Sequence, residues 1–495
     1  MNRIFILTIS LICCLPVFGQ TGEDKSISIS LDEAIARARE KSVQALEAKN
    51  AFVSTYWAYR AYQASRLPSL FLYGNLMNYN RSMVLLQSYE DGSLKYLSAS
   101  NLQNSLGLQI SQNISFTGGT LKLYSDLSRI DQFGNDRNMA WYSQPITLSY
   151  TQPLFAYNQF KWDKLIEPKN YETGCKKYLE SMEDISLRTA EAYYDLLKAY
   201  KELEIKRNSR ANTQKMFEIA SERLKTGSVS KSDCLQIELK ILTDSLAVNE
   251  GLVTLRQAQM TLNSLLGYDA SLSIRPIYED NLPAIILDYE NVVALVLANS
   301  GFKTQNEIKL LEAMADVAKA KASRNISMNF NARFGLTQNA PDFPGAYRNP
   351  LDQEVVGMGF SVPIYDWGLG KGKVQKAIAA LEVVKAQTSQ RENDLKRQIF
   401  NSVGQFNYQR SQCLISKRAA EIAEERYYIV IERFRNAGAS VTELTDAQQD
   451  RESSSLKYIE DQSNFWKFYY SLRKLTLYDF ISGTNIDVQF EEMIN

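Results

Sequence analysis

The stretch Arg324-Asn-Ile-Ser-Met-Asn-Phe-Asn-Ala-Arg-Phe-Gly-Leu336 changes character at every second position. Its even-numbered residues from Ile326 to Leu336 are apolar, and the residues between them are Ser, Asn, Asn, Arg and Gly. A period of two is typical of a strand with one apolar face and one polar face. Similar alternation occurs at 69–79, 146–155 and 356–364. The sequence therefore predicts a few long amphipathic strands.

The polar positions of these strands carry mainly Ser, Thr, Asn, Gln and Gly, whereas a sheet in water usually carries more Lys and Glu. Aromatic residues stand near the strand ends, at Tyr150, Phe155, Tyr365 and Trp367. This pattern favours a transmembrane β-barrel with lipid on the apolar face and a wet lumen on the other. A periplasmic sandwich is the alternative. Four strands cannot close a barrel, so several copies of the chain must share one.

Composition excludes several classes of protein. The chain has 495 residues, of which 45% are hydrophobic and 23% charged, and its 56 basic and 56 acidic residues cancel. A balanced charge argues against a nucleic-acid partner. The sequence contains no histidine, and so lacks the commonest general base and metal ligand. We therefore predict no enzymatic activity, no catalytic residues, no cofactor and no metal.

The N-terminus indicates export. Arg3 precedes the mainly apolar run Ile4–Val17, and Gly19 stands before Gln20, which predicts a secretory signal peptide over 1–19. Beyond it, the longest apolar run is the seven residues Val292–Ala298, too short for a transmembrane helix. The three remaining cysteines are scattered and predict no disulfide framework.

The chain repeats itself. Pro363 follows Pro153 by 210 residues, and Glu432-Arg433 follows Glu222-Arg223 by the same distance. Arg324 follows Arg66 by 258 residues, so the first half holds 48 more residues between Ser69 and Pro153. We interpret this surplus as an extra hairpin around Thr117-Gly-Gly119, which either widens the barrel to six strands per chain or lies outside it. We favour the position outside the barrel because the second half has no counterpart to pair with the hairpin. The predicted repeats are 20–285 and 286–495.

Long helical segments make up most of each repeat. The first repeat contains 30–66, 169–226 and 231–266, followed by a connector over 267–285; the second contains 289–323, 371–436 and 441–478, followed by a C-terminal tail. The segment 371–436 would extend about 100 Å. Apolar and small residues recur every 3.5 positions from Met182 to Leu203, which favours helices packed side by side in a tube. A soluble coiled coil would explain the helices but not the strands.

Several motifs occur in a duplicated order. They are Leu31-Asp-Glu-Ala34, Arg66-Leu-Pro-Ser69, Gln152-Pro-Leu-Phe155, Pro363-Ile-Tyr-Asp-Trp-Gly368, and the helix-tip segments starting at Gly227 and Gly438. In these motifs and their order the chain resembles the outer-membrane efflux proteins of the TolC family. The likeness covers essentially the whole sequence after the signal peptide.

The resemblance implies a mixed α/β membrane protein of the bacterial outer membrane that extends into the periplasm. Three copies would share a twelve-stranded β-barrel standing on a long α-helical barrel. The implied function is a passive exit duct for efflux or type I secretion, docked to a periplasmic adaptor and an inner-membrane pump of the ABC or RND type. A stand-alone porin and a periplasmic coiled-coil spacer are the alternatives.

The resemblance also assigns residues. The acids that narrow the family's periplasmic entrance fall on Glu443 and Asp446, and the first-repeat acid of the entrance lock falls on Asp233. The lock's basic and tyrosine partners fall on Ser440 and Phe434, which departs from the family pattern. The residues expected to contact the adaptor are those of the two tips: Gly227, Ser228, Val229, Ser230, Gly438, Ala439, Ser440 and Val441.

Overall fold

The computed structural model describes residues 26–87, 92–133, 137–225, 227, 229–278, 282–436 and 438–493. The predicted signal peptide and Ser228 lie outside these residues. The chain forms two compact units, each assembled from separated segments. Unit 1 contains 1–45, 185–284 and 408–470, and unit 2 contains 46–184, 285–407 and 471–495. Each unit therefore takes segments from both predicted repeats.

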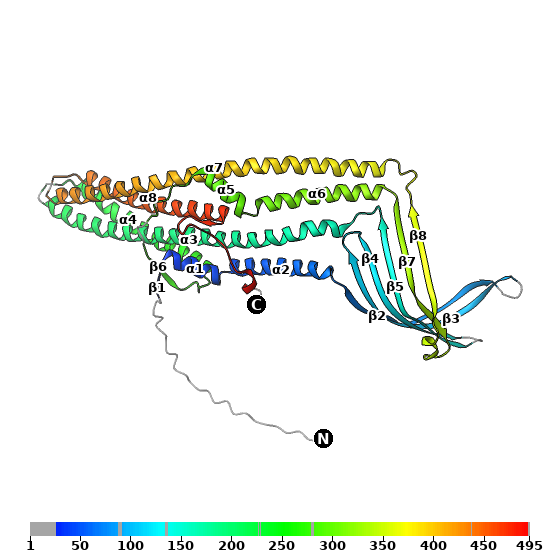
Figure 1. Cartoon of the computed structure of the whole chain (residues 1–495). Coiled ribbons are helices and arrows are strands. Elements are labelled where there is room, and N and C mark those ends of the chain that lie inside the picture. Colours follow the sequence, from blue (N-terminus) through cyan, green and yellow to red (C-terminus); the bar gives the residue numbers. More distant parts are fainter. Residues whose placement is uncertain are drawn as a thin grey trace, which may run out of the picture. The chain divides into compact units, whose positions relative to one another are not determined.

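Unit 2 contains one antiparallel sheet of six strands (Figure 1). The order of strands is β2-β3-β4-β5-β7-β8, so only β6, which lies elsewhere, is skipped. Their bounds are β2 Ser69–Gln87, β3 Leu94–Ile114, β4 Gly119–Phe133, β5 Asn138–Leu154, β7 Ser327–Ala340 and β8 Leu351–Ser361. The four predicted strands are all present, and most are longer than the alternation suggested.

The surplus hairpin lies inside this sheet, so the expectation that it would stand apart from the other strands is wrong. It consists of β3 and β4, which pair from Ser100 opposite Phe133 to Ile114 opposite Gly119 without interruption. On its two sides β3 pairs with β2, and β4 pairs with β5. The prediction relied on symmetry between the two halves of the sequence. A hairpin can nevertheless be inserted into one half alone, provided that both of its outer edges pair with neighbouring strands.

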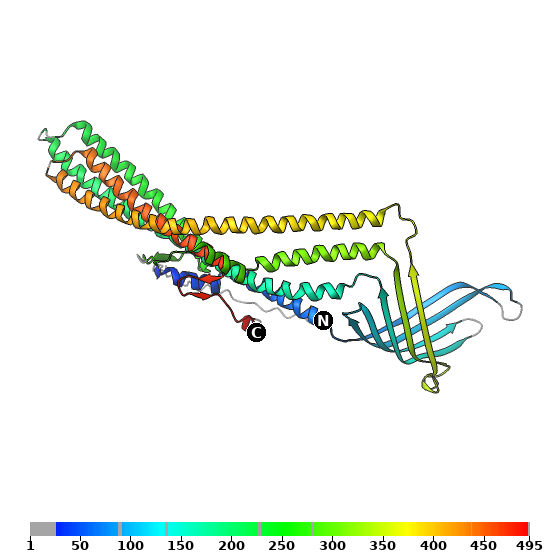
Figure 2. The same ribbon diagram turned by 45° about the horizontal axis from the view of Figure 1, so that its top comes forward.

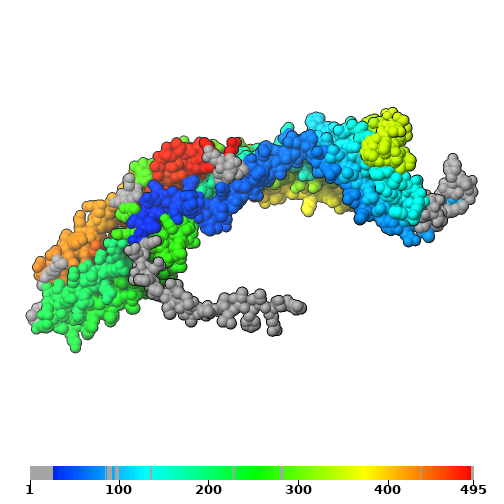
Figure 3. Space-filling view, turned by 90° about the horizontal axis from the view of Figure 1, so that it is seen from below, coloured from blue at the N-terminus to red at the C-terminus, as the bar shows by residue number. Residues whose placement is uncertain are grey.

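Four helices of unit 2 connect directly to the sheet and approach the same end of it (Figures 1 and 2). They are α2 Val43–Ser65, the start of α3 Gln159–Lys225, α6 Phe302–Arg324 and the start of α7 Leu369–Arg435. The helix α5 Tyr289–Asn299 precedes α6. In the space-filling view, the sheet strands β2 to β5 form a continuous surface coloured blue to cyan (Figure 3). The short helix η1 Gly345–Tyr347 lies on it, where Ser143 Oγ donates to Ala346 O.

Unit 1 contains the remaining parts of α3 and α7 together with α1 Leu31–Lys41, α4 Lys231–Leu266 and, up to Tyr470, the helix α8 Val441–Thr476. Two strands that the sequence did not predict, β1 Ser26–Ile29 and β6 Ser273–Pro276, pair in parallel beside them. The buried Tyr193 anchors this small sheet to α3, since its hydroxyl lies 2.6 Å from Ile277 O and 3.1 Å from Ile29 O.

The repeated helices have equal lengths. Both α3 and α7 have 67 residues, and both α4 and α8 have 36. Two predicted helices are each split in two. Ser42 separates α1 from α2 by accepting a bond from Ala45 N, and Ser300 and Gly301 separate α5 from α6. The apolar positions from Met182 to Leu203 are buried, as the 3.5-residue spacing predicted. The duplication itself remains a proposal.

The C-terminal tail contains the short strands β9 Tyr478–Asp479 and β10 Thr484–Asn485 and the turn of helix η2 Phe490–Met493. Over the described residues, no helix has both the length and the apolar character that crossing a membrane requires.

Candidate functional site

Two helix turns in unit 1 carry most of the residues that the sequence singled out. The α3–α4 turn includes Gly227, whose φ of 74° lies in the left-handed region that glycine tolerates. The following helix starts with a capping box, in which Ser230 Oγ accepts from Asp233 N at 3.1 Å and Asp233 Oδ2 accepts from Ser230 N at 3.3 Å. In the α7–α8 turn, Ser440 Oγ accepts from Glu443 N at 3.1 Å.

A cluster of apolar side chains from all four helices lies beneath the turns. Its buried members are Met216, Ala220, Cys234, Ile237, Tyr427, Val430, Phe434, Leu444 and Ala447. Val229, Ala439 and Val441 pack against this cluster. The predicted tip residues therefore divide into two groups. Val229, Ala439 and Val441 contribute to packing, whereas Gly227, Ser230, Gly438 and Ser440 are exposed.

The three candidate acids have different surroundings. Glu443 forms an ion pair with Arg433, with 2.7 Å between Oε1 and Nη1. The same guanidinium donates through Nη2 to Gly438 O at 2.8 Å, and so holds the turn and the acid together. Asp446, one helical turn further along α8, is exposed. Asp233 caps α4 instead of pairing with a basic side chain in any described contact.

Two arginines that received no role from sequence reasoning organise this region. Arg433 binds Glu443. Its repeat counterpart Arg223, on α3, contacts Phe434 at the end of α7. Arg223 Nη2 lies 3.5 Å from Phe434 O, and its guanidinium carbon lies 5.8 Å from the centre of the Phe434 ring. The matched Glu-Arg pairs at a spacing of 210 residues were the available signal, because both arginines belong to them.

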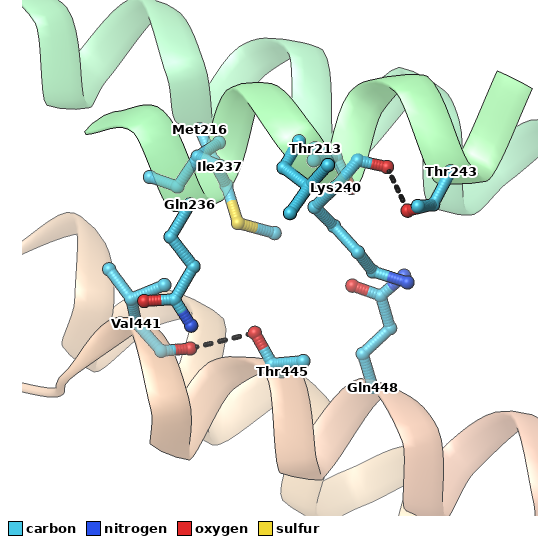
Figure 4. A pocket seen from close by; sticks show the side chains of 10 residues that line it. Thr213, Met216, Gln236, Ile237, Lys240, Thr243, Val441, Thr445 and Gln448 are labelled. Atoms are coloured by element: carbon cyan, nitrogen blue, oxygen red, sulfur yellow. Dashed lines mark hydrogen bonds between the residues drawn. The ribbon is translucent and has the colours of Figure 1, made fainter. Parts of the chain in front are cut away.

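A cavity of about 230 Å³ lies between the α3–α4 hairpin and α8 (Figure 4). Its lining mixes apolar side chains such as Met216 and Ile237 with polar ones such as Lys240 and Gln448. Asp244 lies buried close by, 2.8 Å from Lys240 Nζ and 2.8 Å from Thr213 Oγ1. The side of the cavity toward α3 and α4 is therefore held by a buried polar network.

The sheet of unit 2 has two chemically different faces. Residues opposite each other in neighbouring strands point to the same side, so the register assigns every strand residue to a face. On β3, one face carries Asn101, Gln103, Ser105, Gly107, Gln109, Ser111 and Asn113. The other face carries mainly apolar residues, Leu102, Leu106, Leu108, Ile110 and Ile114, together with Asn104 and Gln112; among them Leu106, Leu108 and Ile110 are exposed. One side is suited to water and the other to an apolar medium.

The same division extends across the sheet. Leu72 of β2, Leu123 of β4 and Leu148 of β5 lie on the apolar face, followed by Phe334 of β7 and Met358 of β8. All five side chains are exposed. An exposed apolar surface that covers six strands is far larger than the isolated apolar residues of ordinary soluble proteins. Its chemistry matches a lipid-facing sheet.

Comparison with known proteins supports this interpretation. The model of the outer membrane efflux protein family matches residues 304–476. Among curated proteins, no sequence matches the chain.

Solved structures of similar fold include the Campylobacter jejuni outer membrane channel CmeC, at 13% identity and a TM-score of 0.66, covering 94% of this chain and 88% of that one. They also include the Vibrio cholerae outer membrane protein VceC, at 14% identity and a TM-score of 0.63, covering 92% and 97%. The open state of the Neisseria gonorrhoeae MtrE outer membrane channel matches at 14% identity and a TM-score of 0.58, covering 93% and 90%.

At these identities the solved structures establish the fold alone, and the family model matches only part of the chain. Residues 304–476 match the model of the outer membrane efflux protein family, and the described chain has the fold of solved outer-membrane channels.

Proposed function

We propose that the protein is the exit duct of a tripartite efflux or type I secretion system. It acts as a passive homotrimeric channel that docks to a periplasmic adaptor and an ABC or RND-type inner-membrane pump. The observation that carries this proposal is the two-faced sheet, whose polar side suits a water-filled lumen while its exposed leucines suit lipid. The duct performs no chemical step, since the pump supplies the energy.

The trimer is supported by the edges of the sheet. The outer strands β2 and β8 each have one side without a partner strand in the described sheet. Unpaired backbone groups cost several kcal/mol each in a hydrocarbon environment, so the edges must pair with other copies. The strands alternate in direction and are even in number, so β2 and β8 run antiparallel. One copy can therefore continue the antiparallel sheet of the next.

Two exposed apolar stripes on the helices of unit 1 support the same assembly. On α4 the stripe consists of Leu235, Leu239, Leu242, Leu246 and Val253, whose spacings of four, three, four and seven residues keep them on one face. On α7 it consists of Tyr408, Ile415, Ile422 and Ile429, seven residues apart. Such seams are typical of helices that pack against a neighbour. We assign them to contacts between copies.

Changing Leu239 and Leu246 together to Glu should prevent trimer formation. Burying unpaired carboxylates at each interface costs several kcal/mol, so we expect the trimer fraction to fall at least about tenfold. Size-exclusion chromatography with light scattering in detergent measures it. Thr254→Glu introduces one carboxylate on α4 at an exposed position outside the stripe and should leave the trimer intact. A double variant that is as trimeric as the parent would remove the stripes from the interface.

The helix tips are the proposed adaptor contact. Gly227, Ser230, Gly438 and Ser440 are small and exposed, which lets a partner helix approach the backbone closely. The nearby cavity between the α3–α4 hairpin and α8 offers both apolar and hydrogen-bonding groups to such a partner (Figure 4). Val229, Ala439 and Val441 support the tips from within.

The variant Gly438→Arg should insert normally and fail to export. A Cβ at this position would meet only the Arg433 backbone oxygen at 3.6 Å and the Arg433 Cβ at 4.0 Å, both ordinary contact distances, so the backbone of the turn can accept a side chain. Export is measured in the native host, in a strain that lacks its own copy of the protein. We expect at least a tenfold loss of export, whereas purified trimers still conduct ions. Thr254→Arg is the control, and normal export by Gly438→Arg would count against docking at the tips.

A further inference from the structure

The number of strands per chain sets the width of the pore that this chain can build. The TolC-family resemblance implies twelve strands in three copies, or four per chain. This chain supplies six, because β3 and β4 are inserted between β2 and β5. The pairing of β3 runs along β2 from Ser69 opposite Ser111 to Gln87 opposite Leu94, with one irregularity between Asn75 and Asn78.

Three side-chain amides fix the inserted hairpin where its turn meets the helices. Gln112 Nε2 donates to Arg66 O at 2.9 Å, at the junction of α2 and β2. Gln152 Nε2 of β5 donates to Thr117 O at 2.8 Å. Asn158 Nδ2, just before α3, lies 3.1 Å from Ser115 O and 3.3 Å from Phe116 O. The hairpin is thus tied to the same end of the sheet as the helices.

The hairpin also shares the two faces of the sheet, which excludes the interpretation that it is a plug or a surface flap. A plug would lie in water and would not need an apolar face. On β4, Leu121, Leu123 and Leu127 continue the apolar face, and Arg129 and Asp131, which pair with each other at 2.8 Å, follow on that face toward the end of the strand at Phe133. Thr120 and Tyr124 continue the polar face opposite β3 residues. Both strands therefore have the surfaces of barrel wall.

We propose that three copies close a barrel of eighteen strands, wider than the twelve-stranded barrel of the family pattern, so that the membrane exit admits any hydrated cargo that the helical part can pass. The inference rests on the trimer of the proposed function. Barrel diameter grows roughly linearly with strand number, so this lumen is about one and a half times as wide. Barrels of 16–18 strands leave an open aqueous channel.

The helices that join the sheet fit the wider barrel. Four helices per chain give twelve in the trimer, and at about 9 Å between neighbouring axes they form a ring about 110 Å around. Eighteen strands spaced about 4.8 Å apart and tilted by about 40° also measure about 110 Å around. Twelve strands would measure about 75 Å on the same estimate. The eighteen-stranded wall continues the helical ring without narrowing it.

Cysteine pairs can establish which strands are neighbours in assembled trimers. Leu72 of β2 stands opposite Leu108 of β3 on the apolar face, and Leu148 of β5 lies three strand spacings away, about 14 Å. We expect Leu72→Cys/Leu108→Cys to be joined by a short thiol cross-linker in trimers purified from outer membranes, and Leu72→Cys/Leu148→Cys not to be joined. Cys175 is half-buried and is replaced by Ser in both variants, whereas Cys234 and Cys413 are buried and burial raises the pKa of Cys413 to about 12.

Polymer exclusion measures the width directly. Polyethylene glycols of increasing size, added to the sheet side of trimers in planar bilayers, lower the conductance until they no longer enter. We expect a limiting polymer radius about one and a half times that of a twelve-stranded channel of the family. A cross-link between β2 and β5 in conducting trimers, or an unchanged limiting radius, would overturn the wider barrel and leave the duct standing. Absence of both trimers and conductance would overturn the proposed function and this inference together.

Discussion

Replacing Arg473 by Met is expected to lower the free energy of unfolding by about 3–5 kcal/mol. Arg473 Nε lies 2.8 Å from Glu183 Oε2 in unit 2, and the Glu183 side chain is fully buried. The two atoms are at ion-pair distance without a hydrogen-bond angle, so their attraction is chiefly coulombic. Arg473 Nη1 also lies 3.2 Å from Asp479 of the C-terminal tail. The substitution therefore removes a cation in contact with a carboxylate that is buried from water.

The adjacent residue provides a matched control. Lys474 Nζ lies 2.6 Å from Asp184 Oδ1, so neighbouring residues of the same two helices form a second ion pair. The Lys474 side chain is 40% exposed, and solvent-exposed pairs contribute at most about 1 kcal/mol. Lys474→Met should therefore cost about 1 kcal/mol or less. Both variants lose one positive charge, so the difference between their free energies of unfolding measures the effect of burying the ion pair.

Urea unfolding of the detergent-solubilised protein, followed by circular dichroism, measures both variants. The combined change Glu183→Gln/Arg473→Met removes the buried charge as well and should recover most of the loss. If Arg473→Met were no more destabilising than Lys474→Met, the buried pair would have no special part in the stability of unit 2.

The regular elements could be predicted from the sequence because their signals are local. Alternation identified β2, β5, β7 and β8, and the 210-residue spacing matched α3 with α7 and α4 with α8. The strand ends were underestimated because polar residues follow one another there, as in Asn78-Tyr-Asn-Arg-Ser82 of β2. Their partners in the sheet, and not their own pattern, extend these strands.

Features that depend on pairing between distant segments escaped prediction. The strands β1 and β6 have four residues each and pair across the whole first half of the chain, so neither shows a periodic pattern of its own. The position of β3 and β4 was misjudged for the same reason, since the sequence reveals a hairpin but not its neighbours.

At the candidate entrance, the resemblance supplied Glu443 and Asp446 but not the ion pair between Glu443 and Arg433. The two residues are ten positions apart and lie on different helices, α7 and α8. A sequence reveals ion pairs at i, i+4 on one helix, but not a pair across the connection between two helices. The resemblance placed the lock's basic and tyrosine partners at Ser440 and Phe434. In the structure Arg433, in the same hairpin, pairs with the entrance acid Glu443, whereas the lock acid Asp233 caps α4.

Changing Glu443 to Gln and Asp446 to Asn together is expected to abolish cation selectivity and block by multivalent cations. In the proposed trimer, two acids from each chain surround one narrow aqueous opening, and such rings favour cations. The barrel wall is a weaker filter. Lys122 and Arg333 lie on its polar face, but a radius of about 18 Å exceeds the screening length of about 8 Å at physiological salt.

The structure predicts that the two acids differ in effect. Arg433 neutralises much of the Glu443 charge, whereas Asp446 is exposed. Asp446→Asn should therefore weaken block more than Glu443→Gln does. Arg433→Gln should have the opposite effect, because it releases the Glu443 carboxylate and so tightens block. If these acids at the start of α8 had a purely structural role, each substitution would lower helix stability by about 1 kcal/mol or less and would leave conduction unchanged.

Single-channel recordings with a trivalent cation on the helix side measure these effects, and stable trimers on gels show that each variant is folded. Glu460→Gln removes an exposed acid further along α8, 3.9 Å from Lys457, and should behave like the parent. Because exposed charges are screened by salt, block of the parent should weaken as ionic strength rises, whereas block by a steric fit would not. Unchanged selectivity in the double variant, with trimers intact, would refute an acidic ring at the entrance. If the trivalent cation blocked the Arg433→Gln variant less readily than the parent, Glu443 would instead face away from the opening.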